Sequence, residues 1–495
     1  MTTTTKDKAV GADVRARLDH PVIDGDSHTQ ETAFAMEDFL KPVAGSEIAA
    51  LWSKFRSIHT VQPLRLTFWN VPSGPASIDR AMSMLPRLRK ARLEEAGLDY
   101  CVIYTTMGLA LVGHRNDEFR RACCRAMNVM NADMYMAADV ADRMTPAAVI
   151  PMNSPAEAID ELEYCVTELG YKTIMIPSEV RTSVKEVAEQ APELAAYTTH
   201  THSFTLDALF DYDPFWQRCA DLKVSIGCHS SPRGGGGLRG SPSNYVFNHL
   251  GSFASGAEFL CRSLFLGGVT RRFPTLRFAF LEGGVGWAAD LYASIVEAWE
   301  KRNMDTLMEY LNPANLDMDL MVEMFEKYGN DYLTPERMRG YPETHNSRLD
   351  ENPDNYDDFR ACEIKQKTDI RDLFVPNFYF GCEADDRLNA IAFDAKLNHM
   401  DARLKATFGS DIGHWDVLDS RSVVNEAYAL VEQGLMSEDD FRDFTFTNNV
   451  TLHAGVNPDF FKAGFAGGSV AGDDAPHRRQ LRCHGCILSN RRHSP

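Results

Sequence analysis

This sequence has no stretch approaching the roughly 18 uninterrupted apolar residues that a membrane-spanning helix needs. Its first twenty residues also lack the apolar core of a signal peptide. Positive charge is scarce, since 51 Lys and Arg stand against 70 Asp and Glu, for a formal net charge of −19. An acidic chain is repelled by nucleic acid and by anionic membranes, so we expect neither as a partner.

A disulfide framework is also missing. The eleven cysteines follow no repeating spacing, and Cys123 and Cys124 are adjacent, which favours a protein of the reducing cytoplasm. No internal repeat is visible. What remains is an ordinary globular composition, 44% hydrophobic and 24% charged over 495 residues, which can form one large domain.

Eight short runs of β-branched or aromatic residues alternate with segments long enough for helices. In one such segment, Ser154–Gly170, apolar residues recur at helical spacing, and Gly170 is placed to end the helix. This alternation predicts either a closed parallel barrel or an open doubly wound sheet. The runs are Val22–Asp26, Tyr100–Thr105, Ala147–Pro151, Thr173–Ile176, Val224–His229, Leu276–Glu282, Asn377–Gly381 and Lys405–Asp411.

Chemically capable residues end several of these runs and decide between the two folds. They are Asp26, Thr105, His229, Glu282 and Asp411. A barrel gathers the carboxyl ends of all its strands around one mouth, whereas an open sheet spreads them along a crevice. We therefore predict an α/β fold of the (β/α)8 TIM-barrel type, with these residues at its mouth.

The expected domain layout follows from the spacing of the runs. Residues 1–20 form an N-terminal arm, 21–465 the barrel, and 466–495 a basic, disordered tail. Two long segments, at about 32–92 and 301–371, exceed what a minimal barrel needs. We interpret both as helical and loop insertions over the barrel mouth, the second containing a helix around Leu320–Tyr328.

The segment DGDSHTQE contains the first candidate metal ligands, Asp26 and His28. Residues two apart at a strand end point to the same side, so this carboxylate and imidazole can bind one ion. Alone, the motif is more typical of a turn. His229 in VSIGCHSSPRGGGG, Glu282 in FAFLEGGVGW and Asp411 in ATFGSDIGHWD each have a structural explanation too, but their shared place at strand ends indicates a metal site.

The chain resembles the amidohydrolase superfamily, in the branch called amidohydrolase family 2, which includes aminocarboxymuconate semialdehyde and resorcylate decarboxylases. The resemblance runs from about Pro21 to Gly464 and includes PVIDGDSHTQE, EEAGLDYCVIYTT, SLFLGGVTRRFPTLRFAFLEGGVGW, FGSDIGHWD and NNVTLHAG. It implies an amidohydrolase-like barrel. It also implies metal ligands at Asp26, His28, His229 and Asp411, with His249 and Glu282 lining the pocket.

Three positions depart from the family pattern. Asp26 replaces the first His of the H-x-H motif, and Glu282 lies where the decarboxylases usually have His. The fourth run is followed by Ser178 and Glu179 with no lysine, so we expect no carbamylated-lysine bridge. Other motifs carry no site: we expect a surface loop at Thr199–His202 and neither a zinc site at Cys483–Cys486 nor a phosphate loop at Gly234–Gly237.

The resemblance favours a metal-dependent hydrolase or decarboxylase that uses zinc or manganese and acts on a small or medium organic substrate, carboxylate-bearing or cyclic. Asp411 would accept a proton from water, Glu282 would orient that water or bind a second metal, and His249 would polarise the substrate. Arg233 and Arg239 would bind an acidic group of the substrate.

Two alternatives remain open from sequence. A set of imidazoles and carboxylates also suits non-haem iron, so a (di)iron monooxygenase acting on a bulky substrate is the second hypothesis. A non-catalytic binding protein on the same barrel is a remote third. Under each hypothesis we expect a homo-oligomer, most simply a dimer.

Overall fold

The computed structural model describes residues 10–60, 70–137, 139–195, 197–229, 241, 243–340 and 356–462. No helix within these ranges is long and apolar enough to cross a membrane.

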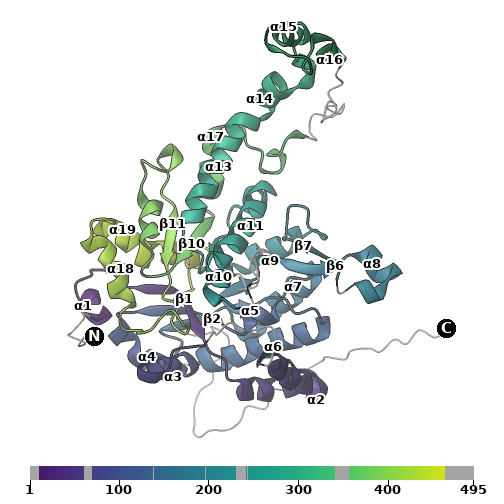
Figure 1. Cartoon of the computed structure of the whole chain (residues 1–495). Coiled ribbons are helices and arrows are strands. Elements are labelled where there is room, and N and C mark those ends of the chain that lie inside the picture. The colour runs from purple at the N-terminus through teal and green to yellow at the C-terminus, as the bar shows by residue number, and fades with distance from the viewer. Residues whose placement is uncertain are drawn as a thin grey trace, which may run out of the picture.

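Eight parallel strands form the centre of the molecule, and each overlaps one of the eight predicted runs (Figure 1). They are hydrogen-bonded in chain order, as β1-β2-β3 and as β4-β5-β8-β9-β10-β11. Their bounds are β1 Ile23–Thr29, β2 Tyr100–Thr105, β3 Met144–Pro146 continued by β4 Ala148–Val149, β5 Thr173–Ile176, β8 Ser225–Cys228, β9 Phe278–Phe280, β10 Phe378–Cys382 and β11 Lys405–Phe408.

Two junctions join the strands into a ring. The third strand changes partner at Ala147, whose amide donates to a carbonyl of β2 at 2.9 Å, while β4 pairs with β5. Just beyond β11, Asp411 N donates to Asp26 O at 3.0 Å and His28 N donates to Ile412 O at 2.9 Å. The predicted (β/α)8 barrel is confirmed, and the second junction already brings candidate ligands together.

Helices run back along the outside of the barrel after most strands. Asn116 and Ser154 cap α6 and α7 by accepting bonds from backbone amides, and Gly170 ends η2 in a left-handed conformation, as predicted for this segment. The outer helices are α4 Pro86–Ala96, α6 Asp117–Tyr135, α7 Pro155–Glu163, η2 Tyr164–Leu169, α9 Asp213–Leu222, α11 Ser252–Leu266, α12 Val269–Arg272, α13 Gly286–Arg302 and α18 Val423–Glu432.

Shorter helices complete the described chain. They are α1 Gly11–Arg15, α5 Gly108–Leu111, α10 Tyr245–His249, η8 Arg387–Phe393, η9 His399–Asp401, α19 Glu438–Arg442, η10 Asp443–Thr447 and α20 Asn448–His453.

Tyr104 fills the barrel next to the candidate ligands. A Cβ at Gly227 would lie 2.7 Å from the Tyr104 hydroxyl, so the glycine makes room for this ring. The ring centroid lies 6.4 Å from that of His28 and 6.2 Å from that of His229. An aromatic side chain therefore packs the interior beside the mouth and keeps bulk water out.

The first insertion leaves the barrel at the carboxyl end of β1. It consists of α2 Ala33–Thr60, η1 Gly74–Ala76 and α3 Ser77–Met84. Thr29 Oγ1 donates to Ser83 O at 3.2 Å, and Ser420 Oγ donates to Asp79 Oδ1 at 2.8 Å, so α3 is anchored to the end of β1 and to the segment that follows β11.

The second insertion differs from the expectation that it covers the mouth. It follows α13, which has already run back from the mouth, and Figure 1 shows it as an arm projecting away from α5 and α10. At its return, Arg271 Nε donates to Cys362 O at 3.0 Å, next to the chain that enters β9. Its elements are α14 Met304–Thr306, η4 Leu307–Leu311, η5 Pro313–Asn315, α15 Met318–Tyr328, α16 Pro335–Arg339, η7 Arg360–Cys362 and α17 Lys367–Phe374.

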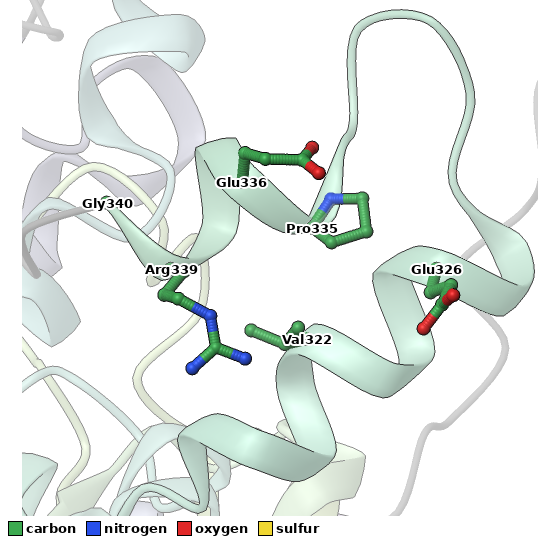
Figure 2. Close-up of a pocket in the computed structure, with 6 residues that line it drawn as sticks. All are labelled: Val322, Glu326, Pro335, Glu336, Arg339 and Gly340. Atoms are coloured by element: carbon green, nitrogen blue, oxygen red, sulfur yellow. The ribbon is translucent and has the colours of Figure 1, made fainter.

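A hollow of roughly 550 Å³ lies between α15 and α16 of the arm (Figure 2). It is lined by Val322, Glu326, Pro335, Glu336 and Arg339. The predicted helix around Leu320–Tyr328 is confirmed as α15, but none of its side chains is fully buried. The hollow is therefore an open surface feature, separated from the barrel mouth by the length of the arm.

A hairpin outside the barrel contains the second H-x-H motif. Strands β6 Val180–Ser183 and β7 Thr199–His202 pair antiparallel, and α8 Lys185–Gln190 and η3 Pro192–Leu194 lie between them. The expected surface loop is thus a strand with exposed His200 and buried His202. Among the described residues, neither histidine belongs to a group that could hold a metal ion.

Candidate metal centre

Asp26 and His28 both lie on β1, which is buried along its whole length. Their alternate positions turn both side chains into the barrel, and Asp26 Oδ1 lies 3.4 Å from His28 Nε2. Arg89 fixes this strand from behind, donating to Ser27 Oγ at 2.6 Å and to the carbonyl of His28. The sequence motif is therefore a rigid pair of donors.

His229 and Glu282 follow β8 and β9 and meet this pair from across the mouth. His229 Nε2 lies 3.2 Å from His28 Nε2 and 3.2 Å from Glu282 Oε2. All three side chains are at least nine-tenths buried. Two imidazole nitrogens this close, flanked by carboxylates, form an arrangement typical of ligands to one cation.

Asp411 lies just past β11, with Oδ1 3.5 Å from His28 Nε2. Both Asp411 and Glu282 have positive φ, at 51° and 58°, a conformation that side chains other than glycine rarely adopt. Such strain costs about 1–3 kcal/mol per residue and is concentrated at functional sites. The two carboxylates are thus held in the mouth against a backbone preference.

A buried contact fixes the turn that carries Asp411. Asp24 Oδ1 accepts a bond from Ser410 N at 2.8 Å, and Asp24 Oδ2 accepts one from Ser410 Oγ at 2.6 Å. Ser410 Oγ in turn accepts from Ile412 N at 3.0 Å. Asp24 therefore acts on the site through Ser410, by holding the backbone on both sides of Asp411.

The sequence analysis missed His414. Its Nδ1 lies 2.7 Å from Asp411 Oδ1 and 3.5 Å from Glu282 Oε1, and its ring stacks on His28 with centroids 3.9 Å apart. Its Nε2 faces Thr106 Oγ1 at 3.3 Å. The signal was present, because His414 follows Asp411 by three residues in FGSDIGHWD, but a residue beyond the strand end has no predictable direction.

The pKa values of the buried carboxylates and imidazoles in the cluster are shifted in the directions that favour binding of a cation. Burial raises the pKa of Asp26 to about 7, and burial with the nearby charges of Glu282 and Asp416 raises the pKa of Asp411 well above its usual range. Burial and the neighbouring imidazoles of His414 and His229 hold the pKa of His28 well below its usual range. Buried carboxylates and neutral imidazoles of this kind fit a bound cation.

Glu282 and His414 behave as a pair. Burial opposes ionisation of Glu282, but hydrogen bonds from His229 and His414 lower its pKa. Burial disfavours the charged form of His414, but the contact with Glu282 raises its pKa. Each of these shifts reflects a partner of opposite charge within the cluster.

Two sets of donors fit a divalent cation. Within each set one donor atom per residue lies within 4.8 Å of the others; the sets are Asp26, His28 and His229, and His28, Glu282, Asp411 and His414. Among the described residues, Asp26 Oδ1 and Asp411 Oδ2 accept no hydrogen bond. Buried carboxylate oxygens without partners are costly, and a cation would satisfy them.

His249, the third predicted catalytic residue, lies outside these sets in an aromatic wall beside the mouth. Its ring lies 5.4 Å from Trp415, 5.5 Å from Tyr245 and 5.7 Å from Phe253, and its Nε2 is 3.9 Å from Asp416 Oδ2. It is thus placed to contact a substrate, and its catalytic role stays a prediction.

Glu383 follows β10 and adds another carboxylate to the mouth. Burial and the charges of Asp416 and Glu282 raise its pKa to about 8. No Lys or Arg in the described ranges forms an ion pair with Glu383 or Asp416. The predicted substrate-binding residues Arg233 and Arg239 lie outside the described residues, as do the glycine-rich segment, the Cys483–Cys486 motif and the basic tail.

An amidohydrolase family model matches residues 94–314, which include β2 to β9. The structure of an amidohydrolase from Mycobacterium avium subsp. paratuberculosis K-10 is similar at 16% identity and a TM-score of 0.50, covering 88% of this chain and 99% of that chain.

Two decarboxylases are also similar in structure. A dihydroxybenzoic acid decarboxylase from Polaromonas sp. JS666, with bound manganese and 2-nitroresorcinol, has 16% identity and a TM-score of 0.48, covering 88% of this chain and 97% of that chain. The 5-carboxyvanillate decarboxylase from Sphingomonas paucimobilis has 16% identity and a TM-score of 0.46, covering 88% and 98%. Likeness at this identity concerns the fold alone. Over residues 94–314 of this eight-stranded α/β barrel, the chain is therefore similar to amidohydrolases.

Proposed function

We propose that this chain is a cation-dependent hydrolase that acts on a ring-bearing substrate such as a lactone, a cyclic amide or an aryl ester. The observation that carries the proposal is the buried cluster of Asp26, His28, His229 and Asp411, together with the aromatic wall beside it. Imidazole and carboxylate donors suit zinc or manganese.

The cation and the side chains have separate tasks. Asp26, His28, His229 and Asp411 would hold a divalent cation, which would supply a water of lowered pKa, about 7. Asp411 Oδ2, which accepts no hydrogen bond among the described residues, would take the proton of that water. Asp411 then returns the proton to the leaving oxygen or nitrogen as the carbon–oxygen or carbon–nitrogen bond breaks, so the residue ends the cycle unchanged.

The charge around the mouth supports hydrolysis of an uncharged substrate. Glu282, Asp411, Asp416 and Glu383 lie at this end of the barrel, and no described Lys or Arg forms an ion pair with them. A substrate carboxylate would have to lie among these acids, which would repel it. Decarboxylation, the other activity that the family resemblance implies, is therefore the second candidate.

A paired assay separates the two reactions. Protein reconstituted with Zn²⁺ or Mn²⁺ is screened against lactones, aryl esters and cyclic amides, with ¹⁸O-labelled water to follow oxygen incorporation, and in parallel against hydroxybenzoic acids, with CO₂ release as the readout. We expect ¹⁸O in a hydrolysis product and no CO₂. Release of CO₂ without hydrolysis would overturn the proposal in favour of decarboxylation.

The Asp411→Asn variant tests the proton acceptor. Its kcat should fall by about 10²–10⁴-fold, the range for loss of a general base. The exposed Asp385→Asn variant, which changes a carboxylate at the rim, is the matched control and should keep kcat within about twofold. Equal loss in both variants would indicate that net charge at the mouth, and not proton transfer, was being measured.

A further inference from the structure

Helix α15 of the arm carries an apolar stripe that the described part of the chain leaves exposed. Leu320, Met324 and Tyr328 are spaced by four residues and therefore lie along one side of the helix. Leu320 is 50% exposed and Tyr328 is 72% exposed. Apolar side chains aligned in this way are typical of a helix face that packs on another element.

A different side of α15 is in contact with the rest of the arm. Val322 and Glu326 line the hollow shared with α16 (Figure 2), and within the described ranges α15 packs mainly against α16. Since α16 has only five residues, it does not cover the stripe as well. An isolated helix shorter than about 12–15 residues is marginal in water, so a further contact on the stripe would stabilise the eleven-residue α15.

The exposed apolar area of the arm approaches the area that each partner of a stable dimer buries. Tyr332 and Leu333, just after α15, are 76% and 54% exposed, and Tyr310 in η4 is 73% exposed. Burial of one tyrosine removes roughly 150–250 Å² from water, so Tyr310, Tyr328 and Tyr332 together offer roughly 300–550 Å². The exposed leucines of the arm bring this area toward the roughly 800 Å² per partner of a standard interface.

The stripe is complementary to a second copy of itself. A two-fold axis at Met324 makes two α15 helices antiparallel and places Tyr328 of one copy opposite Leu320 of the other. Glu323 and Lys327 flank the stripe on one side, and the same axis places Lys327 of one copy beside Glu323 of the other. An anionic membrane would instead be repelled by a chain whose net charge is −19.

The position of the arm leaves room for a second copy. Figure 1 shows α15 and α16 at the end of the arm, away from the strands of the barrel. We propose that the arm is a dimerisation element, in which α15 packs antiparallel on α15 of a second copy of this chain. The inference is independent of the proposed hydrolase function, and it gives the homo-oligomer expected from the sequence a defined interface.

Sedimentation velocity of the full-length protein tests this interface. At micromolar concentration we expect the wild type to sediment with twice the mass of one chain. Tyr328→Asp should sediment with the mass of one chain, because a carboxylate buried opposite Leu320 would have no partner. The matched control Tyr197→Asp changes a tyrosine that is 84% exposed and lies outside the arm, so it should stay dimeric.

Cysteine cross-linking tests the antiparallel arrangement. Met324→Cys places a thiol next to the two-fold axis. A copper–phenanthroline oxidant, which removes one electron and one proton from each thiol, should therefore join two chains by a disulfide that is visible on a non-reducing gel. The Tyr197→Cys control should give no such cross-link, because this residue lies outside the arm.

The other outcomes contradict the inference in different ways. A wild type that stays monomeric would overturn it, and a dimer that persists in Tyr328→Asp would place the interface outside α15. Equal loss of the dimer in Tyr197→Asp would also overturn the assignment to the arm. Circular dichroism excludes unfolding as the cause of a loss. Cation content should be the same in all these variants, so failure of the dimer leaves the proposed function standing.

Discussion

At the scale of single residues, the site depends on two carboxylates in an uncommon backbone conformation. Asp411 and Glu282 have φ of 51° and 58° and are buried among other acids. Positive φ and burial among other acids both lower the stability of the fold, so we attribute them to the function of the site. The cation-free protein should therefore gain stability when one of these residues is replaced.

The Asp411→Gly variant tests this trade-off. Glycine adopts positive φ without strain and removes a buried acid whose pKa is raised by burial and by Glu282. We expect the free energy of unfolding of the cation-free protein to rise by about 1–2 kcal/mol, measured by urea denaturation, while cation binding is lost. Lower stability of the variant would show that Asp411 supports the fold itself.

Asp24 offers a second test at this scale, because it holds the backbone of the site by accepting bonds from Ser410 and from the Asp26 amide. Replacing it by Asn removes one of two acceptor oxygens that hold the Ser410 amide and hydroxyl. Outer contacts of this kind typically change metal affinity by about 10–100-fold, and we expect a loss in this range for Asp24→Asn by calorimetric titration with Mn²⁺. The exposed Asp385→Asn variant is the control and should bind Mn²⁺ as the wild type does. Unchanged Mn²⁺ affinity in Asp24→Asn would show that Asp24 does not support the metal site.

The sequence predicted most of the cluster and missed one member. Asp26 and His28 lie in β1, and His229, Glu282 and Asp411 follow their strands by one to three residues. A barrel brings the carboxyl ends of its strands to one mouth. His414 lies six residues beyond the end of β11, where the turn held by Asp24 and the glycine after Ile412 set its direction. The pattern of a strand contains no information about such a turn.

At the scale of elements, the eight strands were predictable because each buries a short apolar run between turn residues. The location of the second insertion was not predictable, since the apolar pattern of a helix does not reveal at which end of the barrel the insertion begins. Only the direction of α13, which runs away from the mouth, places the described residues 301–340 and 356–371 at the opposite end. The hairpin of β6 and β7 was missed because its strands are short and mostly exposed.

The C-terminal helix α20 is linked to the barrel by a buried histidine that yields a pH prediction. His453 Nδ1 contacts Ser225 Oγ at 2.7 Å at the start of β8, and its ring stacks on Phe460 at 4.2 Å. Burial lowers the pKa of His453 to about 3, from 6.5 in an unfolded chain. Below pH 6.5 the unfolded state therefore binds a proton that the folded state does not, and stability falls with falling pH.

The expected size of this effect is about 2 kcal/mol of unfolding free energy between pH 7 and pH 5. Urea denaturation at pH 7, 6 and 5 measures it in the wild type and in His453→Gln. The variant should be less stable at pH 7 but should lose less stability on acidification. Parallel pH profiles for the two proteins would contradict burial of a neutral His453.

At the scale of the whole molecule, the arm and the barrel mouth are separate. The arm leaves after α13, and its side chains Leu320, Tyr328, Tyr332 and Leu333 are at least half exposed. Replacing residues 312–355 by a short Gly-Ser linker should therefore leave cation stoichiometry and the thermal midpoint of the barrel unchanged. Loss of bound cation in the shortened protein would show that the arm supports the mouth.

The central claim is that Asp26, His28, His229 and Asp411 hold a divalent cation at the mouth of this barrel. The most direct test is a crystal structure of Mn²⁺-loaded protein, with an anomalous difference map recorded near the manganese absorption edge. We predict a peak about 2.0–2.3 Å from the Nε2 atoms of His28 and His229. A map with peaks only at the surface, or none among these four side chains, would contradict the account.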